Sequence, residues 1–373
     1  MSASEQLRRE VYGLLGAPID VADMATVLLR IGNAVSDSSP FLISTVNLNF
    51  LISSQTDSEF RESLLLSDLC TADGMPIVWL GRLMGVPIKK RIAGADIFDK
   101  LRTTKIVGNR LKIFLFGGDE GIAATACKRL NTEPTDVTCV GFLYPGFGAV
   151  DDMSAPGTIE AINQSGANFL AVALGARKGQ TWLRQNHARL RIPVRVHLGA
   201  AINFQAGTLK RAPIVMQSVG LEWLWRIKEE PQLWRRYWND GLALLALVTT
   251  RVFPLLLVAL WGRLTARHLG EDLKITSSGD HDSVIINLDG SATAKTVEKA
   301  AVLFESAGAT SKDIVVNFTN TRQIDARFLG LILMLDKYLK KQGHQLRLSG
   351  TSPRIEKLFR LNGFEFLLRP ATK

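Results

Sequence analysis

The sequence predicts an α/β protein with a Rossmann-like, mainly parallel sheet followed by a second, small α/β domain. Between residues 18 and 210, short apolar runs alternate with amphipathic stretches, a pattern typical of βαβ units. A similar alternation starts again after residue 282. A chain of 373 residues has room for two or three domains, each with its own hydrophobic core.

The first alternating region contains five apolar runs that we expect to be strands. Three of them lead directly into glycine, at Gly117-Gly118, Gly175 and Gly199. A strand that ends in glycine before a helix lets backbone amides approach a ligand at the carboxyl edge of a parallel sheet. Any one of these glycines can equally mark an ordinary turn. Together, however, the four glycines after three strands favour a ligand-binding edge. The expected strands are residues 41–45, 111–116, 137–140, 169–174 and 194–198.

Residues 219–240 are rich in tryptophan and arginine. Four of the seven tryptophans lie there, interleaved with Arg226, Arg235 and Arg236. Such a mixture can line an anionic pocket, form a protein interface or lie among membrane headgroups. A plain core helix explains the tryptophan spacing but not the interleaved arginines.

Residues 241–264 form the most apolar stretch of the chain. Their length approaches that of a membrane span, but Arg251 and Pro254 interrupt the stretch and both flanks are basic. We expect a broken helix at residues 241–267, lying in the interface of an anionic membrane surface with Trp238 and Trp261 at its ends. The alternatives are a buried helical hairpin or oligomer interface, and a true span.

A second domain is expected at residues 282–373, after a charged linker at residues 268–282. With roughly 100 residues it is large enough to fold by itself. Its expected strands are residues 284–288, 313–318 and 346–348, and its expected helices are residues 293–307, 329–341 and 352–361.

The charge balance indicates an anionic partner. The net charge is +10 and the pI is about 9.6, which leaves nucleic acid, a nucleotide ligand and an anionic membrane surface as candidates. No nucleic-acid-binding element is recognisable, so we expect no nucleic-acid partner. Cys70, Cys127 and Cys139 have neither CxxC spacing nor an even count, which predicts neither a zinc site nor a disulfide framework and favours a reducing cytoplasm. Residues 1–20 lack the apolar core of a signal peptide, so we expect no export.

Polar and charged residues gather between residues 45 and 96. Thr45 and Asn47 have short polar side chains that can hold hydroxyl groups. Asp73 precedes a glycine at a turn, and Arg91 supplies positive charge that suits a diphosphate. Taken singly, Thr45 can end a strand, Asp73 can cap a turn and Arg91 can be a solvated charge. Together they predict a site for an anionic, hydroxyl-rich ligand.

Several motifs follow one another in a fixed order around and after this region. They are Thr45-Val46-Asn47, Ala72-Asp73-Gly74-Met75-Pro76, Arg91-Ile92-Ala93-Gly94-Ala95-Asp96, Phe116-Gly117-Gly118, Tyr144-Pro145-Gly146-Phe147, His197-Leu198-Gly199-Ala200 and Lys210-Arg211-Ala212-Pro213. With these motifs, residues 18–240 closely resemble the WecG/TagA/CpsF family of bacterial glycosyltransferases. We therefore place a glycosyltransferase domain at residues 1–240.

The resemblance implies transfer of a sugar, with inversion, from a UDP-sugar to a polyprenyl-diphosphate-linked saccharide in exopolysaccharide or cell-envelope polymer synthesis. It implies a peripheral protein at the cytoplasmic face of the bacterial inner membrane, with no metal or other cofactor. Asp73 is expected to be the catalytic base with Thr45 beside it, because a carboxylate within hydrogen-bond reach can take a proton from an acceptor hydroxyl. The expected substrate-binding residues are Asn47, Arg91, Gly117, Gly118, Gly175, Lys178, Gln180, Gly199, Asn203 and Arg211.

The chain departs from the family pattern in two places. Where the family has Gly-x-Pro-Lys-Gln-Glu-x-Trp, this chain has Gly179 and Gln180 at the Gln and Glu positions. Asn203 replaces an aspartate of the family. Altered donor specificity explains these changes, and so does an alternative function, a catalytically impaired sugar-nucleotide-binding scaffold.

Residues 282–370 resemble a STAS domain, the fold of anti-sigma-factor antagonists. The resemblance lies in the loop from Asn317 to Asp325 and the following Ala326-Arg327-Phe328-Leu329-Gly330. Ala326 and Arg327 stand where such domains carry serines, so a phosphorylation switch is not expected. The resemblance implies a module for docking a protein partner or for homo-oligomerisation, with nucleotide sensing as a weaker alternative.

Overall fold

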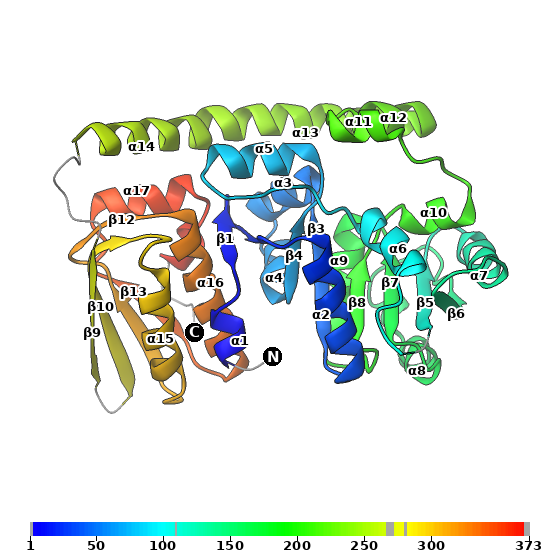
Figure 1. The fold of residues 1–373 in the computed structure, drawn as a ribbon, viewed down its shortest axis with the longest axis horizontal. Helices are drawn as coiled ribbons and strands as arrows, with labels where there is room; N and C mark the ends of the chain where they lie inside the picture. Colours follow the sequence, from blue (N-terminus) through cyan, green and yellow to red (C-terminus); the bar gives the residue numbers. More distant parts are fainter. Residues whose placement is uncertain (1–2, 109, 266–271, 280–281, 369–373) are drawn as a thin grey trace. The chain divides into compact units, whose positions relative to one another are not determined.

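The computed structural model describes residues 3–108, 110–265, 272–279 and 282–368, and the chain divides into two compact units (Figure 1). The Rossmann-like unit comprises Ala22–Val78 and Lys89–Leu242. The terminal unit comprises Met1–Val21, Trp79–Ile88 and Ala243–Lys373. Both are mixed α/β structures, which confirms the expected fold class.

The Rossmann-like unit is built on a six-stranded sheet in which every paired strand is parallel. The strand order is β4-β3-β8-β7-β5-β6. All five expected strands are present, and β4 is an additional one. The strands are β3 (Phe41–Val46), β4 (Leu69–Ala72), β5 (Leu111–Gly117), β6 (Val137–Leu143), β7 (Phe169–Ala173) and β8 (Val194–His197).

Helices cover both faces of this sheet, because its strands are apolar on both sides. In β5, Ile113 and Leu115 join one buried cluster, whereas Phe114 and Phe116 join another. Continuous apolar runs of this kind are typical of parallel strands buried on two faces. Helices α2 (Met24–Ser36), α6 (Gly94–Thr103), α7 (Ile122–Thr132) and α10 (Ala201–Ala206) contribute to the first cluster, and α8 (Pro156–Gln164) and α9 (Ala176–Asn186) to the second. Helices α3 (Leu48–Thr56) and α4 (Ser58–Leu66) connect β3 to β4, and α5 (Met75–Leu83) follows β4.

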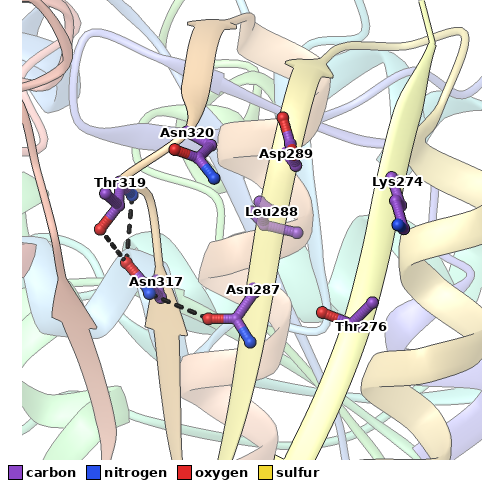
Figure 2. A pocket seen from close by; sticks show the side chains of 8 residues that line it. All are labelled: Lys274, Thr276, Asn287, Leu288, Asp289, Asn317, Thr319 and Asn320. Atoms are coloured by element: carbon purple, nitrogen blue, oxygen red, sulfur yellow. Dashed lines mark hydrogen bonds between the residues drawn. The ribbon is translucent and has the colours of Figure 1, made fainter.

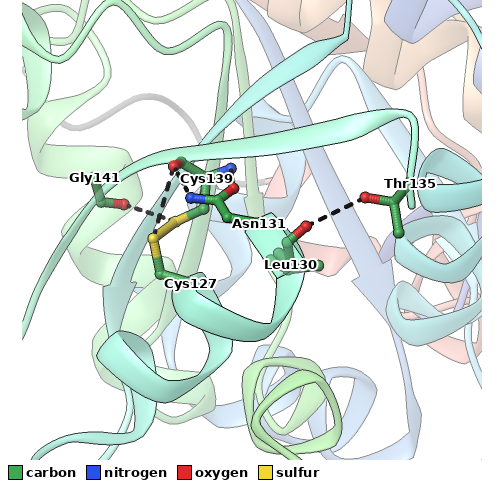
Figure 3. The surroundings of a disulfide bond; sticks show 6 residues. All are labelled: Cys127, Leu130, Asn131, Thr135, Cys139 and Gly141. Atoms are coloured by element: carbon green, nitrogen blue, oxygen red, sulfur yellow. Dashed lines mark hydrogen bonds between the residues drawn. A yellow bond between two sulfur atoms is a disulfide. The ribbon is translucent and has the colours of Figure 1, made fainter. Parts of the chain in front are cut away.

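Cys127 and Cys139 form a disulfide, so the expectation of none is wrong (Figure 3). Their sequence separation of 12 gives no hint of contact, but the β5-α7-β6 crossover lays α7 against β6 and brings the two Cα atoms to 5.2 Å. Asn131 holds the same segment, because its amide donates to the Cys139 carbonyl and accepts from the Cys139 N–H, both at 2.9 Å. Cys70 is a free, buried cysteine.

The tryptophan- and arginine-rich region forms short helices with little burial. Helices α11 (Ile214–Ser218) and α12 (Glu222–Glu229) have no buried residue. A plain core helix is therefore the wrong interpretation of this region. A 3₁₀ turn (Pro231–Leu233) then leads into α13 (Trp234–Leu247), whose buried Asp240 accepts from the Asn49 amide of α3 at 3.3 Å.

The apolar stretch is a helix interrupted by a π-helical turn at Val248–Val252 and resumed as α14 (Phe253–Thr265). The hydroxyls of Thr249 and Thr250 donate to the carbonyls of Leu245 and Ala246, at 2.9 and 2.6 Å. The wider turn precedes Pro254, which cannot donate a backbone hydrogen bond. The helix thus continues from α13 into α14 with a widened turn at this place, and the expectation of a broken helix is wrong. Of the residues expected at its far end, Arg267 lies outside the described residues, and the side chains of Trp261 and Arg263 do so too.

The terminal unit contains a five-stranded sheet of order β12-β10-β11-β13, with β9 antiparallel to β10. The three expected strands and three expected helices are present. Its elements are β9 (Leu273–Gly279), β10 (Ser283–Ala292), α15 (Val297–Gly308), β11 (Asp313–Asn317), β12 (Thr321–Ile324), α16 (Ala326–Lys341), β13 (Leu346–Ser349), α17 (Pro353–Leu361) and a final 3₁₀ turn (Glu365–Leu367). Strand β9 lies within residues 268–282, where a linker was expected, so that expectation is wrong for residues 273–279. Residues 268–271, 280 and 281 lie outside the described residues.

The N-terminal segment belongs to this terminal unit. Helix α1 (Ala3–Leu7) and the hairpin of β1 (Val11–Leu14) and β2 (Ala17–Asp20) contact α16. A Cβ on Gly330 of α16 would lie 2.0 Å from the Val11 carbonyl oxygen, so only glycine permits this approach. Arg9 and Asp20 form a buried ion pair at 2.7 Å that closes the hairpin.

Arg327, at the start of α16, is buried in the same contact. Its guanidinium donates to the Val11 carbonyl at 3.1 Å and lies over the Tyr12 ring. The hairpin of β1 and β2 therefore covers the beginning of α16. Ala326, at the other position where STAS domains carry a serine, is buried as well.

Candidate active site

The predicted site residues come together at the carboxyl edge of the parallel sheet. Strands β3, β8, β7 and β5 are neighbours in that order. Their ends deliver Thr45, Gly199, Gly175 and Gly117 in turn to one edge. In open α/β sheets this edge is where ligands bind.

Asp73 lies directly after β4 and is fixed by backbone contacts on both sides. Its own N–H donates to the Val46 carbonyl at 2.9 Å, and the Gly94 N–H donates to its carboxylate. Gly94 opens α6, and a Cβ there would lie 3.4 Å from the Thr45 hydroxyl oxygen. Thr45 and Asp73, the two catalytic candidates, therefore flank the same helix N-terminus.

The environment of Asp73 disfavours its charged form. Burial, the carboxylate of Glu222 and that of Asp96 raise the pKa of Asp73 to about 7, against the opposing effects of Arg91 and of the Gly94 N–H. A carboxyl group with a pKa near 7 exchanges a proton readily at neutral pH. That property suits a general acid or base.

Arg91 and Arg211 belong to a network of arginines and carboxylates, which we call the Arg–Asp network. Arg91 donates to Glu222 at 2.9 Å and to Gln217 at 2.5 Å, and it lies 3.7 Å from Asp96. Arg211 donates to Asp96 and Asp99, both at 2.5 Å. Protein carboxylates thus already neutralise much of the charge of both arginines.

Asn47 and Asn203 stand on helices next to the sheet edge. Asn47 is the N-cap of α3, where its side-chain oxygen accepts from the Phe50 N–H at 3.0 Å. This local role uses the oxygen that was expected to hold a ligand hydroxyl. Asn203 is half-buried on α10, and its backbone carbonyl accepts from the N–H groups of Gly207 and Thr208.

The glycines after β5 and β7 allow backbone geometry that other residues rarely adopt. Gly117, Gly118 and Gly175 have φ of 100°, 82° and 75°. A Cβ on Gly117 would lie 2.5 Å from the Ala173 carbonyl oxygen, to which Gly118 N–H donates at 2.8 Å. The Gly117-Gly118 pair therefore serves the close approach of two strands as well as any ligand.

Two residues expected to contact the donor are placed elsewhere. Gln180 is fully buried and shares hydrogen bonds with the Ser44 hydroxyl, at 3.3 and 3.2 Å, so it is a core residue and not a ligand contact. Gln180 was expected to bind the donor because it occupies the Glu position of the family motif, but α9 directs its side chain into the core. Lys178 is on the exposed side of α9 and donates to the Gly148 carbonyl at 2.9 Å.

His197 and Gly94 are site residues that the sequence interpretation did not single out. Gly94 lies inside the quoted Arg91–Asp96 motif, and a glycine at a helix start was the available signal. His197 ends β8 between Gly175 and Gly199, is 5% exposed, and contacts the Phe50 ring at a centroid distance of 5.8 Å. The sequence showed that His197 lies at the end of an expected strand, but it did not show that the side chain is buried.

Metal-binding side chains do not cluster among the described residues: no three His, Cys, Asp or Glu side chains there are arranged to hold an ion. The terminal unit has a polar cavity of about 270 Å³ on the face of β9, β10 and β11 (Figure 2). Asn317 organises its wall, donating to Asn287 at 2.9 Å and accepting from the Thr319 N–H and hydroxyl at 3.0 and 2.7 Å. The cavity lies outside the site just described.

Comparison with known proteins agrees with this geometry. The glycosyl transferase WecG/TagA/CpsF family model matches residues 12–255, and the Mlab, STAS domain model matches residues 275–369. A Bacillus subtilis (strain 168) protein named N-acetylglucosaminyldiphosphoundecaprenol N-acetyl-beta-D-mannosaminyltransferase is 27% identical over 197 residues, or 52% of this chain and 74% of the relative. A Bacillus spizizenii (strain ATCC 23059 / NRRL B-14472 / W23) protein of the same name is 26% identical over 194 residues, 52% of this chain and 73% of the relative.

Proposed function

Because the chain belongs to the WecG/TagA/CpsF family of glycosyltransferases, we propose that it moves a sugar from a UDP-sugar to a polyprenyl-diphosphate-linked saccharide. The names of the two Bacillus relatives, which describe transfer to a diphosphoundecaprenol-linked N-acetylglucosamine, support this acceptor class. The product enters synthesis of an exopolysaccharide or another envelope polymer. The observation that carries the proposal is a carboxyl group with a pKa of about 7 at the ligand-binding edge of the sheet.

Asp73 acts as the general base in this proposal. Its carboxylate takes the proton from the acceptor hydroxyl, and the hydroxyl oxygen forms a bond to the anomeric carbon of the donor sugar. The bond from that carbon to the diphosphate oxygen breaks, its electron pair leaves with UDP, and the anomeric configuration inverts. The Gly94 N–H, which donates to Asp73, orients the carboxylate for this transfer.

The leaving diphosphate is stabilised by cations and backbone N–H groups, and no metal ion is required. Arg91, whose charge acts on Asp73, and Arg211 both pair with Asp96 in the Arg–Asp network. A diphosphate that approaches them must exchange with Asp96, Asp99 or Glu222, so donor binding rearranges the network. Fixed positive charge at a developing anion is an efficient form of transition-state stabilisation.

The protein acts at the cytoplasmic face of the inner membrane as a peripheral protein. Large apolar side chains of α11 to α13 are exposed, among them Ile214 at 82% and Trp238 at 64%. The helical stretch Pro231–Leu260 has the length and composition of a possible membrane span, with a mean hydropathy of 2.2. Arg235 and Arg236 pack on aromatic rings of α13, which favours an interfacial position over a span.

An impaired, sugar-nucleotide-binding scaffold is the second candidate. The observation that favours it is the pairing of Arg91 and Arg211 with protein carboxylates, which leaves less positive charge for a diphosphate. In that case the STAS-like domain carries the function by docking a protein partner or a second copy. The polar cavity on the sheet of this domain supports such docking. The beginning of α16 does not, because the hairpin of β1 and β2 covers it.

A transfer assay separates the two candidates. Full-length protein is incubated with a panel of UDP-sugars and a polyprenyl-diphosphate-linked saccharide, with and without EDTA, and the lipid product is identified by mass spectrometry. The proposal expects one UDP-sugar to extend the lipid, and EDTA to leave the rate unchanged. UDP-sugar binding without any transfer across the panel would favour the scaffold, and loss of transfer in EDTA would overturn the metal-free mechanism.

A further inference from the structure

The imidazole of His197 takes the space of a missing side chain at the candidate site. It ends β8 beside Val172 of β7. A Cβ on Gly179, in the first turn of α9, would lie 2.2 Å from the ring's Cδ2 and 2.8 Å from its Nε2. The Cδ2 edge of the ring therefore faces Gly179, and Cε1, on the other side of Nε2, would lie 3.7 Å from a Cβ on Gly199. This contact also explains the glycine at position 179, since any larger residue there would overlap the ring.

The hydrogen bonds of the ring fix its tautomer. The Gly175 carbonyl is hydrogen-bonded to the imidazole, whereas Nε2 is buried and has no partner among the described residues. Nδ1 must therefore make the bond, and it must carry the hydrogen because a carbonyl can only accept. Burial lowers the pKa of His197 to about 4, so the ring is neutral at pH 7. Nε2 then presents a bare lone pair.

A buried acceptor without a partner is unfavourable, and a ligand that donates a hydrogen bond to it would remove that cost. His197 lies among the glycines of the sheet edge, hydrogen-bonded to Gly175 and close to Gly199. This is the edge where the sugar nucleotide is proposed to bind. A phosphate oxygen does not suit a lone pair, since both are acceptors. A hydroxyl does, because it donates to Nε2.

We propose that His197 is a donor-recognition residue whose Nε2 accepts a hydrogen bond from a hydroxyl group of the bound sugar nucleotide. The inference rests on the proposed UDP-sugar donor. Both the ribose and the transferred sugar carry hydroxyl groups, and the two sources share this chemistry. The Gly179 and His197 pair thus provides a polar contact in the region where the family motif has a glutamine.

Nitrogen-15 NMR of the full-length protein, labelled at its histidine rings, tests the proposal directly. The Nε2 resonance of His197 is expected in the range of an unprotonated nitrogen and moves upfield when the nitrogen accepts a hydrogen bond. A shift with UDP alone identifies the ribose; a shift only with UDP-sugar identifies the transferred sugar. His187, whose ring contacts Arg195 away from the sheet edge, is the control resonance.

Two substitutions separate recognition from packing. His197→Phe keeps an aromatic ring without the acceptor, and His197→Gln keeps an acceptor near the position of Nε2. We expect His197→Phe to raise the donor KM about 3–30-fold with a smaller change in kcat, as for one lost hydrogen bond. His197→Gln is expected to keep the donor KM close to that of wild type. Equal donor KM values for wild type and Phe, or an Nε2 resonance that stays fixed at saturating UDP-sugar, would overturn the inference alone. Absence of any UDP-sugar binding would overturn both this inference and the proposed function.

Discussion

The carboxyl group of Asp73 is held between opposing charges. Glu222 and Asp96 repel its negative form, whereas Arg91 and the Gly94 N–H favour it, and burial tips the balance toward a pKa of about 7. The same residues thus set both the position and the proton affinity of the proposed base. Small changes in this surrounding shell are expected to alter the pH dependence of transfer before they alter the fold.

The rate of transfer should rise with pH through the pKa of Asp73. A base must be unprotonated, so kcat/KM is low below pH 7 and levels off above it. Glu222→Gln removes a repelling charge and is expected to move the inflection to lower pH. The profile is measured with wild type and variant between about pH 5.5 and 8.5. A rate that does not change across this range would exclude Asp73 as the titrating base.

The free energy of unfolding should fall as pH rises toward the pKa of Asp73, whereas the rate of transfer should rise. Because the folded-state pKa of Asp73 is raised above its unfolded value of about 3.8, the folded state binds the proton more tightly. Stability is then greatest below the unfolded pKa and is lost as pH rises toward 7. Asp73→Asn is expected to melt at a higher temperature than wild type at pH 8, with a smaller difference at pH 5. A higher melting temperature for wild type at pH 8 would contradict the raised pKa.

Sequence motifs predicted the position of Asp73 and Thr45 but not their surroundings. Glu222 lies far along the chain from Asp73, so no local pattern shows that the two carboxylates repel each other. Gln180 illustrates the opposite error, because its motif position suggested a ligand contact while its helix turns it into the core. Asn47 was correctly placed at the end of β3, yet a helix cap uses its oxygen.

At the scale of elements, helices α11 to α13 combine exposed apolar side chains with arginines. Trp234 and Trp238 are 52% and 64% exposed. The buried Asp240, held by Asn49 of α3, fixes α13 to the Rossmann-like unit. In the proposed function, this amphipathic surface contacts the membrane that holds the lipid-linked acceptor.

Removing the two exposed tryptophans should weaken membrane binding. Trp234→Ser with Trp238→Ser is expected to lower partitioning to anionic vesicles by about tenfold or more, since each large aromatic contributes on the order of 1.5–3 kcal/mol when buried. Vesicle flotation measures this effect. Leu29→Ser, at an equally exposed position of α2, is the control and should not change binding. Unchanged flotation of the double variant would place the membrane contact elsewhere.

Elements with strong apolar runs were predicted well, and short or polar ones were not. The five apolar runs of the first sheet are all strands. The missed strands include β4 and β12, with four residues each, and β9, whose side chains are mostly polar and exposed. The hairpin of β1 and β2 was missed too, because its burial depends on α16 at the other end of the chain. Tertiary contact, not local pattern, decides these elements.

At the scale of the whole molecule, the two ends of the chain fold into one unit. The hairpin of β1 and β2 contacts α16, and Gly13 approaches Phe364, where a Cβ would lie 2.6 Å from the ring. The family model that begins at residue 12 therefore starts inside a hairpin that belongs structurally to the terminal unit. The N-terminal hairpin is therefore part of the same compact unit as the STAS-like domain.

A single methyl group should disrupt this closure. Gly330→Ala places a Cβ 2.0 Å from the Val11 carbonyl oxygen, and we expect a loss of about 1–3 kcal/mol in the free energy of unfolding of the terminal unit. Denaturant unfolding measures the change. Gly157→Ala, where no atom lies within 4 Å of the new Cβ, is the control. Equal stability of the two variants would show that the hairpin does not pack on α16.

Asp73 is the proposed base of a transfer from a UDP-sugar to a polyprenyl-diphosphate-linked saccharide. The most direct measurement compares wild type and Asp73→Asn in one assay, with lipid product quantified by mass spectrometry and UDP binding measured by calorimetry. We predict that the variant loses about 10²–10⁴-fold in turnover while it binds UDP as wild type does. Turnover by Asp73→Asn at the wild-type rate would contradict the account.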